Sequence, residues 1–164
     1  MMDVEVVRGD ITTQDVDVVV NAANRAMRGG GGVDGAIHRA GGPAVLRDCV
    51  ERFPDGLDTG QAGWTTAGDL PARWVIHVVG PNQHAGETDP DLLASCYREA
   101  LRLADELGAQ TLAAPLVSAG VYGWPLDDAA RIAVETVRDS EAEVALVRFV
   151  AFGADAEAAL NAVL

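Results

Sequence analysis

The chain contains no lysine, and all twelve of its basic residues are arginine. This absence excludes a lysine nucleophile or Schiff base, and it excludes a Walker-type phosphate loop, which requires its lysine. Positive charge is scarce overall, because 25 acidic residues leave a formal net charge of −13. Nucleic-acid binding needs clustered cations, so we expect none, and any anionic ligand must be held largely by neutral donors. The exclusive use of arginine, with abundant Ala, Gly, Val and Asp, is typical of GC-rich genomes and suggests a bacterial source.

Metal-ligating residues are also few. Cys49 and Cys96 lie far apart in the sequence, and His38, His77 and His84 form no His-x-x-His pair. We therefore predict no metal and no cofactor, with His38 and His77 in structural roles and two buried thiols in a reducing cytosol. No signal peptide is recognisable, and no apolar run approaches the ~20 residues of a membrane span. The expected location is cytoplasmic, without membrane contact.

The remaining sequence reads as one α/β domain covering residues 1–164. Nearly continuous β-branched segments at 16–21 and 74–79 predict strands buried on both faces. Strands are also expected at 4–8, 111–115 and 144–152, helices at 35–40, 44–52, 91–107, from 125 and from 155, and loops at 55–63 and 82–90. Alternating strands and helices favour a parallel or mixed sheet covered on both faces.

A glycine-rich segment carries most of the functional signal. Asn21-Ala22-Ala23-Asn24 ends a strand, and the glycines Gly29, Gly30, Gly31 and Gly32 follow shortly before Val33 and Asp34. Ordering four glycines is costly, which is reasonable where bare backbone N–H groups must approach a ligand. Such groups beside a helix N-terminus suit a phosphate. We predict a pocket for a phosphate-bearing ligand whose sugar is handled by Asn24 and Asp34.

A second loop, Ser118-Ala119-Gly120-Val121-Tyr122-Gly123, also follows a predicted strand. Ligands of open α/β sheets collect beyond the carboxyl ends of strands, so the two loops should share one cleft. Leu116 occupies the first glycine position of a Gly-x-Ser-x-Gly elbow, which argues against Ser118 as a nucleophile. We therefore expect the backbone of this loop to hold phosphate.

Several motifs, taken in order, resemble a macrodomain of the MacroD type, and the resemblance covers nearly the whole chain. These motifs are Gly9-Asp10-Ile11-Thr12, Asn21-Ala22-Ala23-Asn24, the run from Gly29 to Ala40, Val79-Gly80-Pro81, Cys96-Tyr97-Arg98 and the run from Ser118 to Pro125. The resemblance implies a three-layer α/β/α sandwich with a central mixed sheet of about six strands. It also implies a hydrolase that removes mono-ADP-ribose from Glu and Asp esters of modified proteins and deacetylates O-acetyl-ADP-ribose.

The resemblance further implies a role for each site residue. Asp10 would accept a hydrogen bond from the adenine amino group, with Ile11 and Phe152 beside the base. The diphosphate would lie between Gly30, Gly31, Gly32 and Val33 on one side and Ser118, Ala119, Gly120, Val121 and Tyr122 on the other. Asn24 would bind the distal ribose, and Asp34 would position the attacking water together with the phosphate of the substrate.

The residues alone leave alternatives open. Asp10 could cap the turn that follows it, Asp34 could cap a helix, and Phe152 or Tyr122 could belong to the core. Asn21 is expected to be structural, and Asp34 is expected to be exposed. Ala119 departs from the threonine usual in the family. At the level of function, the alternative is a non-catalytic ADP-ribose reader; a monomer is the default, and ADP-ribosylated nucleic-acid ends stay open as substrates.

Overall fold

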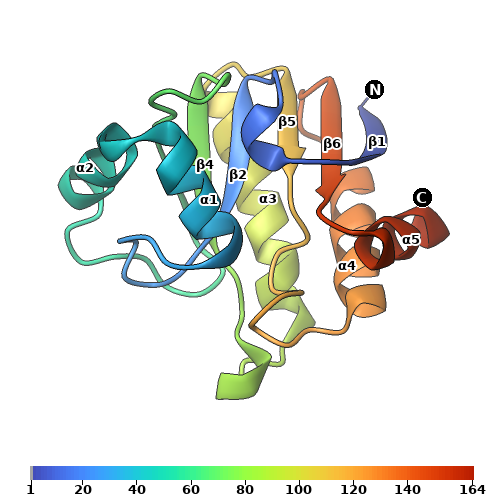
Figure 1. The fold of residues 1–164 in the computed structure, drawn as a ribbon. Helices are drawn as coiled ribbons and strands as arrows, with labels where there is room; N and C mark the ends of the chain where they lie inside the picture. Colours follow the sequence, from blue (N-terminus) through green and yellow to red (C-terminus); the bar gives the residue numbers. More distant parts are fainter. Residues whose placement is uncertain (1) are drawn as a thin grey trace.

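The computed structural model describes residues 2–164 and contains one six-stranded sheet in the order β1-β6-β5-β2-β4-β3 (Figure 1). The strands are β1 (Asp3–Arg8), β2 (Val18–Ala23), β3 (Ala62–Thr66), β4 (Trp74–Val79), β5 (Thr111–Ala114) and β6 (Leu146–Ala151). Neighbouring strands pair in parallel except for β3, which runs antiparallel to β4. The predicted mixed sheet is confirmed.

Helices cover both faces of this sheet. They are α1 (Gly32–Gly41), α2 (Pro43–Arg52), α3 (Pro90–Glu106), α4 (Leu126–Arg138) and α5 (Ala154–Val163). Buried side chains of α3, α4 and α5 share the larger core with the sheet, whereas Ile37 of α1 lies in a second core on the opposite face. Figure 1 shows α1 and α2 on the near side of the strands and α3 behind them. The α/β/α sandwich is confirmed.

Successive side chains of the central strands point to opposite faces of the sheet, which determines which residues lie beneath α1. Val18 and Val20 of β2 belong to the core beneath α3 and α4, while Val19 belongs to the core beneath α1. Side chains two residues apart share a face, so Asn21 lies on the α1 face with Val19. The same alternation places His77 of β4 on that face beside Val75. Because Asn21 and His77 are paired in the parallel register, their side chains are neighbours.

Several predicted boundaries are wrong. The sequence analysis missed strand β3, placing residues 62 and 63 in a loop, and it missed the short 3-10 helix Gln83–Ala85 within the predicted loop 82–90. Helix α1 begins at Gly32, three residues earlier than expected. Helix α5 begins at Ala154, one residue before the predicted start, and Gly153 is its N-cap. None of the helices in residues 2–164 has the length and apolar character needed to cross a bilayer.

Four neighbouring parallel strands end at one edge of the sheet. Asp10 follows β1, Phe152 follows β6, Ser118 comes after β5, and Asn24 follows β2, in the spatial order of the strands. With a strand spacing of about 4.8 Å, these four segments span an edge of about 14 Å. All predicted ligand-binding segments therefore lie along one continuous edge, which we call the rim.

Candidate ligand-binding site

The glycine segment after β2 presents backbone donors. The N–H groups of Gly30 and Gly31 have no hydrogen-bond partner within residues 2–164, and no side chain caps the start of α1. The first turn of a helix has N–H groups without intrahelical acceptors and carries partial positive charge. This end of α1 is therefore suited to an anion without any cationic side chain.

The loop after β5 presents a second set of donors. The N–H groups of Gly120, Val121 and Tyr122 have no partner in the described part of the chain. Ser118 has a positive φ of 68°, which is uncommon for a residue with a side chain. Such a backbone conformation costs about 1–3 kcal/mol and persists where the surroundings enforce it. Since β5 pairs with β2, the two loops face each other across adjacent strand ends.

Tyr97 of α3 supports this second loop, a role the sequence analysis did not assign. Its buried hydroxyl donates to the Pro115 carbonyl at 3.0 Å and accepts from the Val117 N–H at 3.0 Å. Burial raises the pKa of this hydroxyl above its ordinary value. The only sequence signal was the Cys96-Tyr97-Arg98 motif, because Tyr97 also fits the apolar stripe of the helix. The neutral phenol thus fixes the chain just before Ser118.

Asn24 and Asp34 converge at Gly30. A Cβ atom built on Gly30 would lie 3.4 Å from Asn24 Nδ2 and 3.2 Å from Asp34 Oδ2. Asn24 also closes its own loop, donating to the Gly29 carbonyl and accepting from the Met27 N–H, each at 3.2 Å. The two residues predicted to handle the sugar are thus brought together beside the first set of backbone donors.

Asp34 is not the exposed carboxylate that the sequence predicted. It is the third residue of α1, rather than a cap before it, and it is only 5% exposed. The helix turns its side chain inward, where Oδ1 accepts a hydrogen bond from Asn21 Nδ2 at 2.8 Å. His38, one turn later, places Nε2 at 3.3 Å from the same oxygen. The buried, hydrogen-bonded Asn21 is structural, as predicted.

Behind Asn21 lies His77, whose two ring nitrogens both have partners. Nδ1 is 3.0 Å from Asn21 Nδ2, and Nε2 is 2.8 Å from the Thr65 hydroxyl. Burial is the main cause that lowers the pKa of His77 to about 4, with His38 adding to the effect. His77 is therefore neutral at physiological pH. The structural role expected for His77 fits these contacts, but the sequence gave no sign of its link to Asp34.

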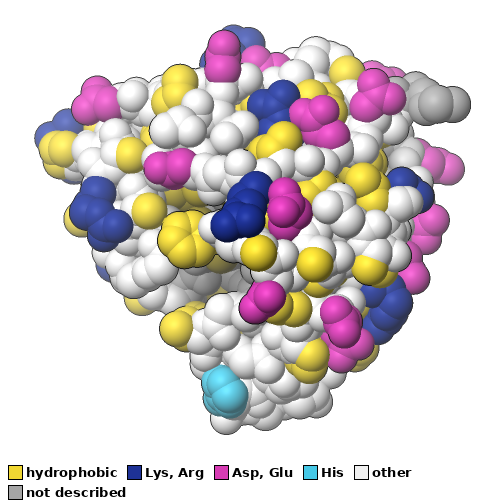
Figure 2. Space-filling view, turned by 45° about the vertical axis from the view of Figure 1, so that its right-hand side comes forward, with side chains coloured by type: hydrophobic (Ala, Val, Ile, Leu, Met, Phe, Trp, Pro, Cys, Tyr) yellow, Lys and Arg dark blue, Asp and Glu magenta, His cyan; other side chains and the backbone are white. Residues whose placement is uncertain are grey.

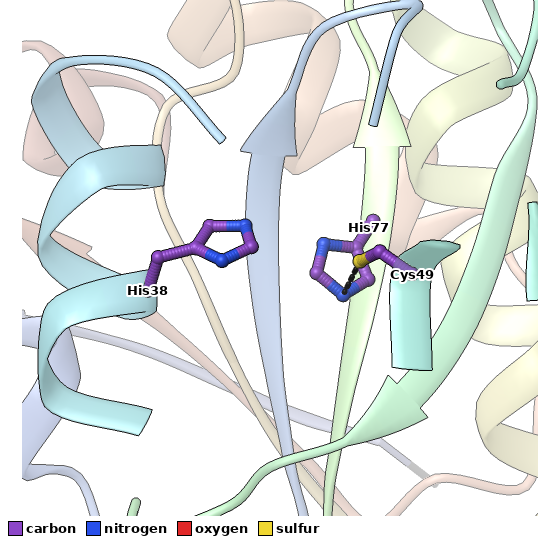
Figure 3. A group of neighbouring side chains, drawn as sticks. All are labelled: His38, Cys49 and His77. Carbon is purple, nitrogen blue, oxygen red and sulfur yellow. Dashed lines mark hydrogen bonds between the residues drawn. The ribbon is translucent and has the colours of Figure 1, made fainter. Parts of the chain in front are cut away.

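No metal cluster was expected among the histidines, but the structure brings two of them together with Cys49. Figure 3 shows His38 and His77 approaching each other with Cys49 beside them, and their potential ligand atoms lie within 4.8 Å of one another. The chemistry suits a metal poorly, because both nitrogens of His77 are engaged. Burial also raises the pKa of the Cys49 thiol to about 11, whereas a metal needs the thiolate. The absence of a metal stays a prediction.

The other end of the rim carries Asp10, Ile11 and Phe152. Asp10 does cap the following turn, accepting from the Thr12 N–H and hydroxyl, and these bonds lower the pKa of its carboxyl. Phe152 is not a core residue, since 91% of it is exposed. Ile11 is buried. Figure 2 shows one face of the molecule, on which acidic and arginine side chains are interspersed around a hollow.

Tyr122 lies at the opposite end, near the two polar residues at Gly30. It is partly buried, and its pKa is raised first by burial and then by the charges of Glu87 and Asp34. Its carbonyl accepts a hydrogen bond from the Gln83 N–H at 2.8 Å. Tyr122 is therefore a partly buried residue within range of the Asp34 charge, and it is not a core residue.

Comparison with known proteins shows the family to which the chain belongs. The family model described as Macro domain matches residues 20–133. An O-acetyl-ADP-ribose deacetylase of Enterobacter cloacae is 53% identical over 137 residues, covering 82% of this chain and 76% of the relative.

Two solved structures are similar in fold as well as in sequence. An Oceanobacillus iheyensis macrodomain with ADP has a TM-score of 0.93 and 40% identity, covering 98% of this chain and 88% of its own. A Trypanosoma brucei macrodomain in complex with ADP-ribose has a TM-score of 0.88 and 39% identity, covering 97% and 68%. The likeness therefore extends over nearly the whole of this chain.

Proposed function

The chain belongs to the macrodomain family, and on that premise we propose that it binds ADP-ribose along the rim and hydrolyses ADP-ribosyl esters. Its substrates are proteins carrying mono-ADP-ribose on Glu or Asp side chains, and O-acetyl-ADP-ribose. The relative named as an O-acetyl-ADP-ribose deacetylase and the neighbours with ADP and ADP-ribose support this choice.

In the proposed complex the ligand extends along the strand ends. The adenine lies between Asp10 and Phe152, where a carboxylate can accept from the amino group and an exposed ring can stack on the base. The diphosphate lies between the glycine segment and the loop after Ser118, held by N–H groups. Backbone donors avoid a cationic side chain, which fits a chain with a net charge of −13.

The distal ribose then reaches Asn24 and Asp34. The Asn24 amide both donates and accepts, as a ribose diol requires. Asp34 holds a water molecule for attack on the ester, with the neighbouring phosphate of the substrate sharing in its orientation. Because Asn21 fixes Oδ1 of Asp34, Oδ2 is the oxygen available on the side of Gly30.

The observation that carries the proposal is the convergence of Asn24 and Asp34 at Gly30. A non-catalytic reader needs the two sets of backbone donors to bind the ligand. It does not need a buried carboxylate beside an amide side chain at the first of these sets. The test measures ADP-ribose release from a glutamate-modified protein and acetate release from O-acetyl-ADP-ribose, by the native chain and by Asp34→Ala. We expect release by the native chain and a loss of at least about a hundredfold in the variant.

Binding of ADP-ribose must be measured alongside turnover. Asp34→Ala should still bind ADP-ribose, because the backbone donors are retained. A native chain that binds ADP-ribose but releases none from either substrate would be a reader, and the enzymatic proposal would be wrong. Parallel assays with serine-linked, arginine-linked and nucleic-acid-linked ADP-ribose would define the accepted linkages.

A further inference from the structure

A buried hydrogen-bond chain runs from the candidate catalytic carboxylate along the α1 face of the sheet to the edge strand β3. It runs from Asp34 of α1 through Asn21 of β2 and His77 of β4 to Thr65 of β3, with distances of 2.8, 3.0 and 2.8 Å. All four residues are at most 5% exposed. We call these four residues the relay.

The direction of each bond in the relay follows from Asp34. An ionised carboxylate can only accept, so the Asn21 amide must turn its NH₂ group toward Asp34 Oδ1. That same nitrogen faces His77 Nδ1, which must then offer a lone pair. The proton of the neutral imidazole consequently resides on Nε2 and is donated to the Thr65 hydroxyl. Thr65 can accept it, because its own proton goes to the Thr66 carbonyl at 2.9 Å.

This orientation of the Asn21 amide leaves its carbonyl oxygen without a partner. Asn21 Oδ1 is buried and has no hydrogen-bond partner within residues 2–164. Buried polar atoms are seldom left unpaired in native proteins. The opposite amide orientation would instead place Oδ1 against the Asp34 carboxylate, at a repulsive distance between two acceptors. The unpaired oxygen is thus a consequence of holding Asp34 in place.

From these contacts we infer that His77 is a positioning residue for the proposed hydrolysis, acting as a neutral Nε2–H tautomer that orients the Asn21 amide and, through it, Asp34. This inference rests on the proposed function for its effect on turnover. The relay itself is independent of any activity. Cys49 lies 3.7 Å from His77 Nε2, beside the relay and not within it.

Two substitutions separate the nitrogens of His77. The amide of His77→Asn can place its oxygen where Nδ1 was, whereas the longer side chain of His77→Gln places its amide near the Nε2 position and leaves no acceptor at the Nδ1 position. We expect His77→Asn to retain kcat within about threefold and His77→Gln to lose at least about tenfold, since small misplacements of a reacting group are costly. The Kd for ADP-ribose should change in neither variant. Equal losses in both variants would overturn the inference.

A second measurement does not depend on turnover or on replacing His77. Nitrogen NMR of the imidazole in the native chain should show an unprotonated Nδ1 and a protonated Nε2. In Thr65→Val, which keeps the side-chain shape but removes the acceptor of Nε2–H, the Nε2–H tautomer should persist, because the Asn21 amide still requires a lone pair on Nδ1. Cys49→Ala is the matched control and should leave both the tautomer and kcat unchanged.

The outcomes distinguish the two proposals. A native chain that hydrolyses no ADP-ribosyl ester, but shows the expected tautomer both in the native chain and in Thr65→Val, would refute the proposed function and leave the relay intact. A native His77 that carries its proton on Nδ1 would overturn the relay whatever the activity. So would a proton that moves to Nδ1 in Thr65→Val.

Discussion

Asn21 Nδ2 lies 2.8 Å from Asp34 Oδ1, inside the protein and behind the glycine segment. The Asp34 carboxylate is thereby anchored from β2 and is only 5% exposed. Its two oxygens have different environments, because Oδ1 is bound by Asn21 and Oδ2 faces Gly30.

Asn21→Leu should impair both stability and turnover. The change leaves Asp34 Oδ1 and His77 Nδ1 without the shared donor, which should lower the free energy of unfolding by about 1–3 kcal/mol. Chemical denaturation and initial-rate assays measure the two effects. Asn161→Leu, on the exposed face of α5, is the control and should stay within about 0.5 kcal/mol of the native chain.

Tyr97→Phe should weaken ADP-ribose binding, although Tyr97 is expected to make no contact with the ligand. Loss of the hydroxyl leaves the Val117 N–H and the Pro115 carbonyl unpaired, at about 1–3 kcal/mol of stability. Thermal unfolding and calorimetric titration with ADP-ribose test this. Tyr122→Phe removes a hydroxyl with no hydrogen bond in the described chain, so its stability should be native. Equal destabilisation of both variants would contradict the assigned role of Tyr97.

Gly80→Ala should displace the second loop. A Cβ atom at Gly80 would clash with Ser118 Oγ and lie 2.6 Å from Val117 Cγ1, so the side chains just before the proposed backbone donors must move. We expect a loss of ADP-ribose affinity of at least about tenfold, because backbone donors act only at correct positions. Gly9→Ala is the control for stability, since only one atom, at 4.0 Å, lies near its Cβ. Native affinity in Gly80→Ala would argue against this loop as a binding element.

Phe152→Ala should reduce affinity without reducing stability. The ring is 91% exposed, so its removal costs the folded state little, whereas stacking on a base contributes about 1–3 kcal/mol to binding. The Kd for ADP-ribose should therefore rise by a factor of about five to 140. Ribose 5-phosphate, which has no adenine, should bind both proteins equally. A preserved Kd would remove Phe152 from the site.

Burial of neutral His77 predicts a pH dependence of folding. Its pKa is lowered from 6.5 to about 4, mainly by burial and then by His38, against the opposing charges of Asp34 and Asp48. Below pH 6.5 His77 is protonated in the unfolded chain but stays neutral in the folded chain. The free energy of unfolding therefore decreases as pH falls from 6.5 toward 4. The full effect is about 3 kcal/mol and is absent above pH 6.5.

The contribution of His77 is isolated by comparing the native chain with His77→Asn. The carboxylates titrate in both proteins, so their contribution to the pH dependence cancels. Urea unfolding across this pH range should give a steeper loss in the native chain. Parallel curves for the two proteins would show that His77 does not titrate as expected.

The fold class, the glycine segment and the loop that begins at Ser118 could be predicted from the sequence because their signals are local. Buried β-branched strands, the glycine run and the order of motifs all lie within short segments. Strand β3 was missed, since Ala62, Gly63 and the threonines beside Trp64 lack the alternation of a strand. Its place depends on pairing with β4, which a local pattern does not reveal.

The connection between Asp34 and His77 could not be predicted for a similar reason. It requires the register that pairs Asn21 with His77, two residues 56 positions apart. The inward turn of Asp34 likewise depends on α1 beginning at Gly32, and boundaries are the least certain part of a sequence prediction. The roles of the individual residues in ligand binding stay predictions.

The account depends on main-chain N–H groups, not on cationic side chains, as the donors to the diphosphate. Its most direct test is the Kd of ADP-ribose, measured by calorimetry at low and at high salt. A cradle of neutral donors in a chain of net charge −13 predicts saturable binding whose affinity does not fall as salt is added. No saturable heat, or an affinity that drops steeply with salt as arginine–phosphate pairs would require, would contradict it.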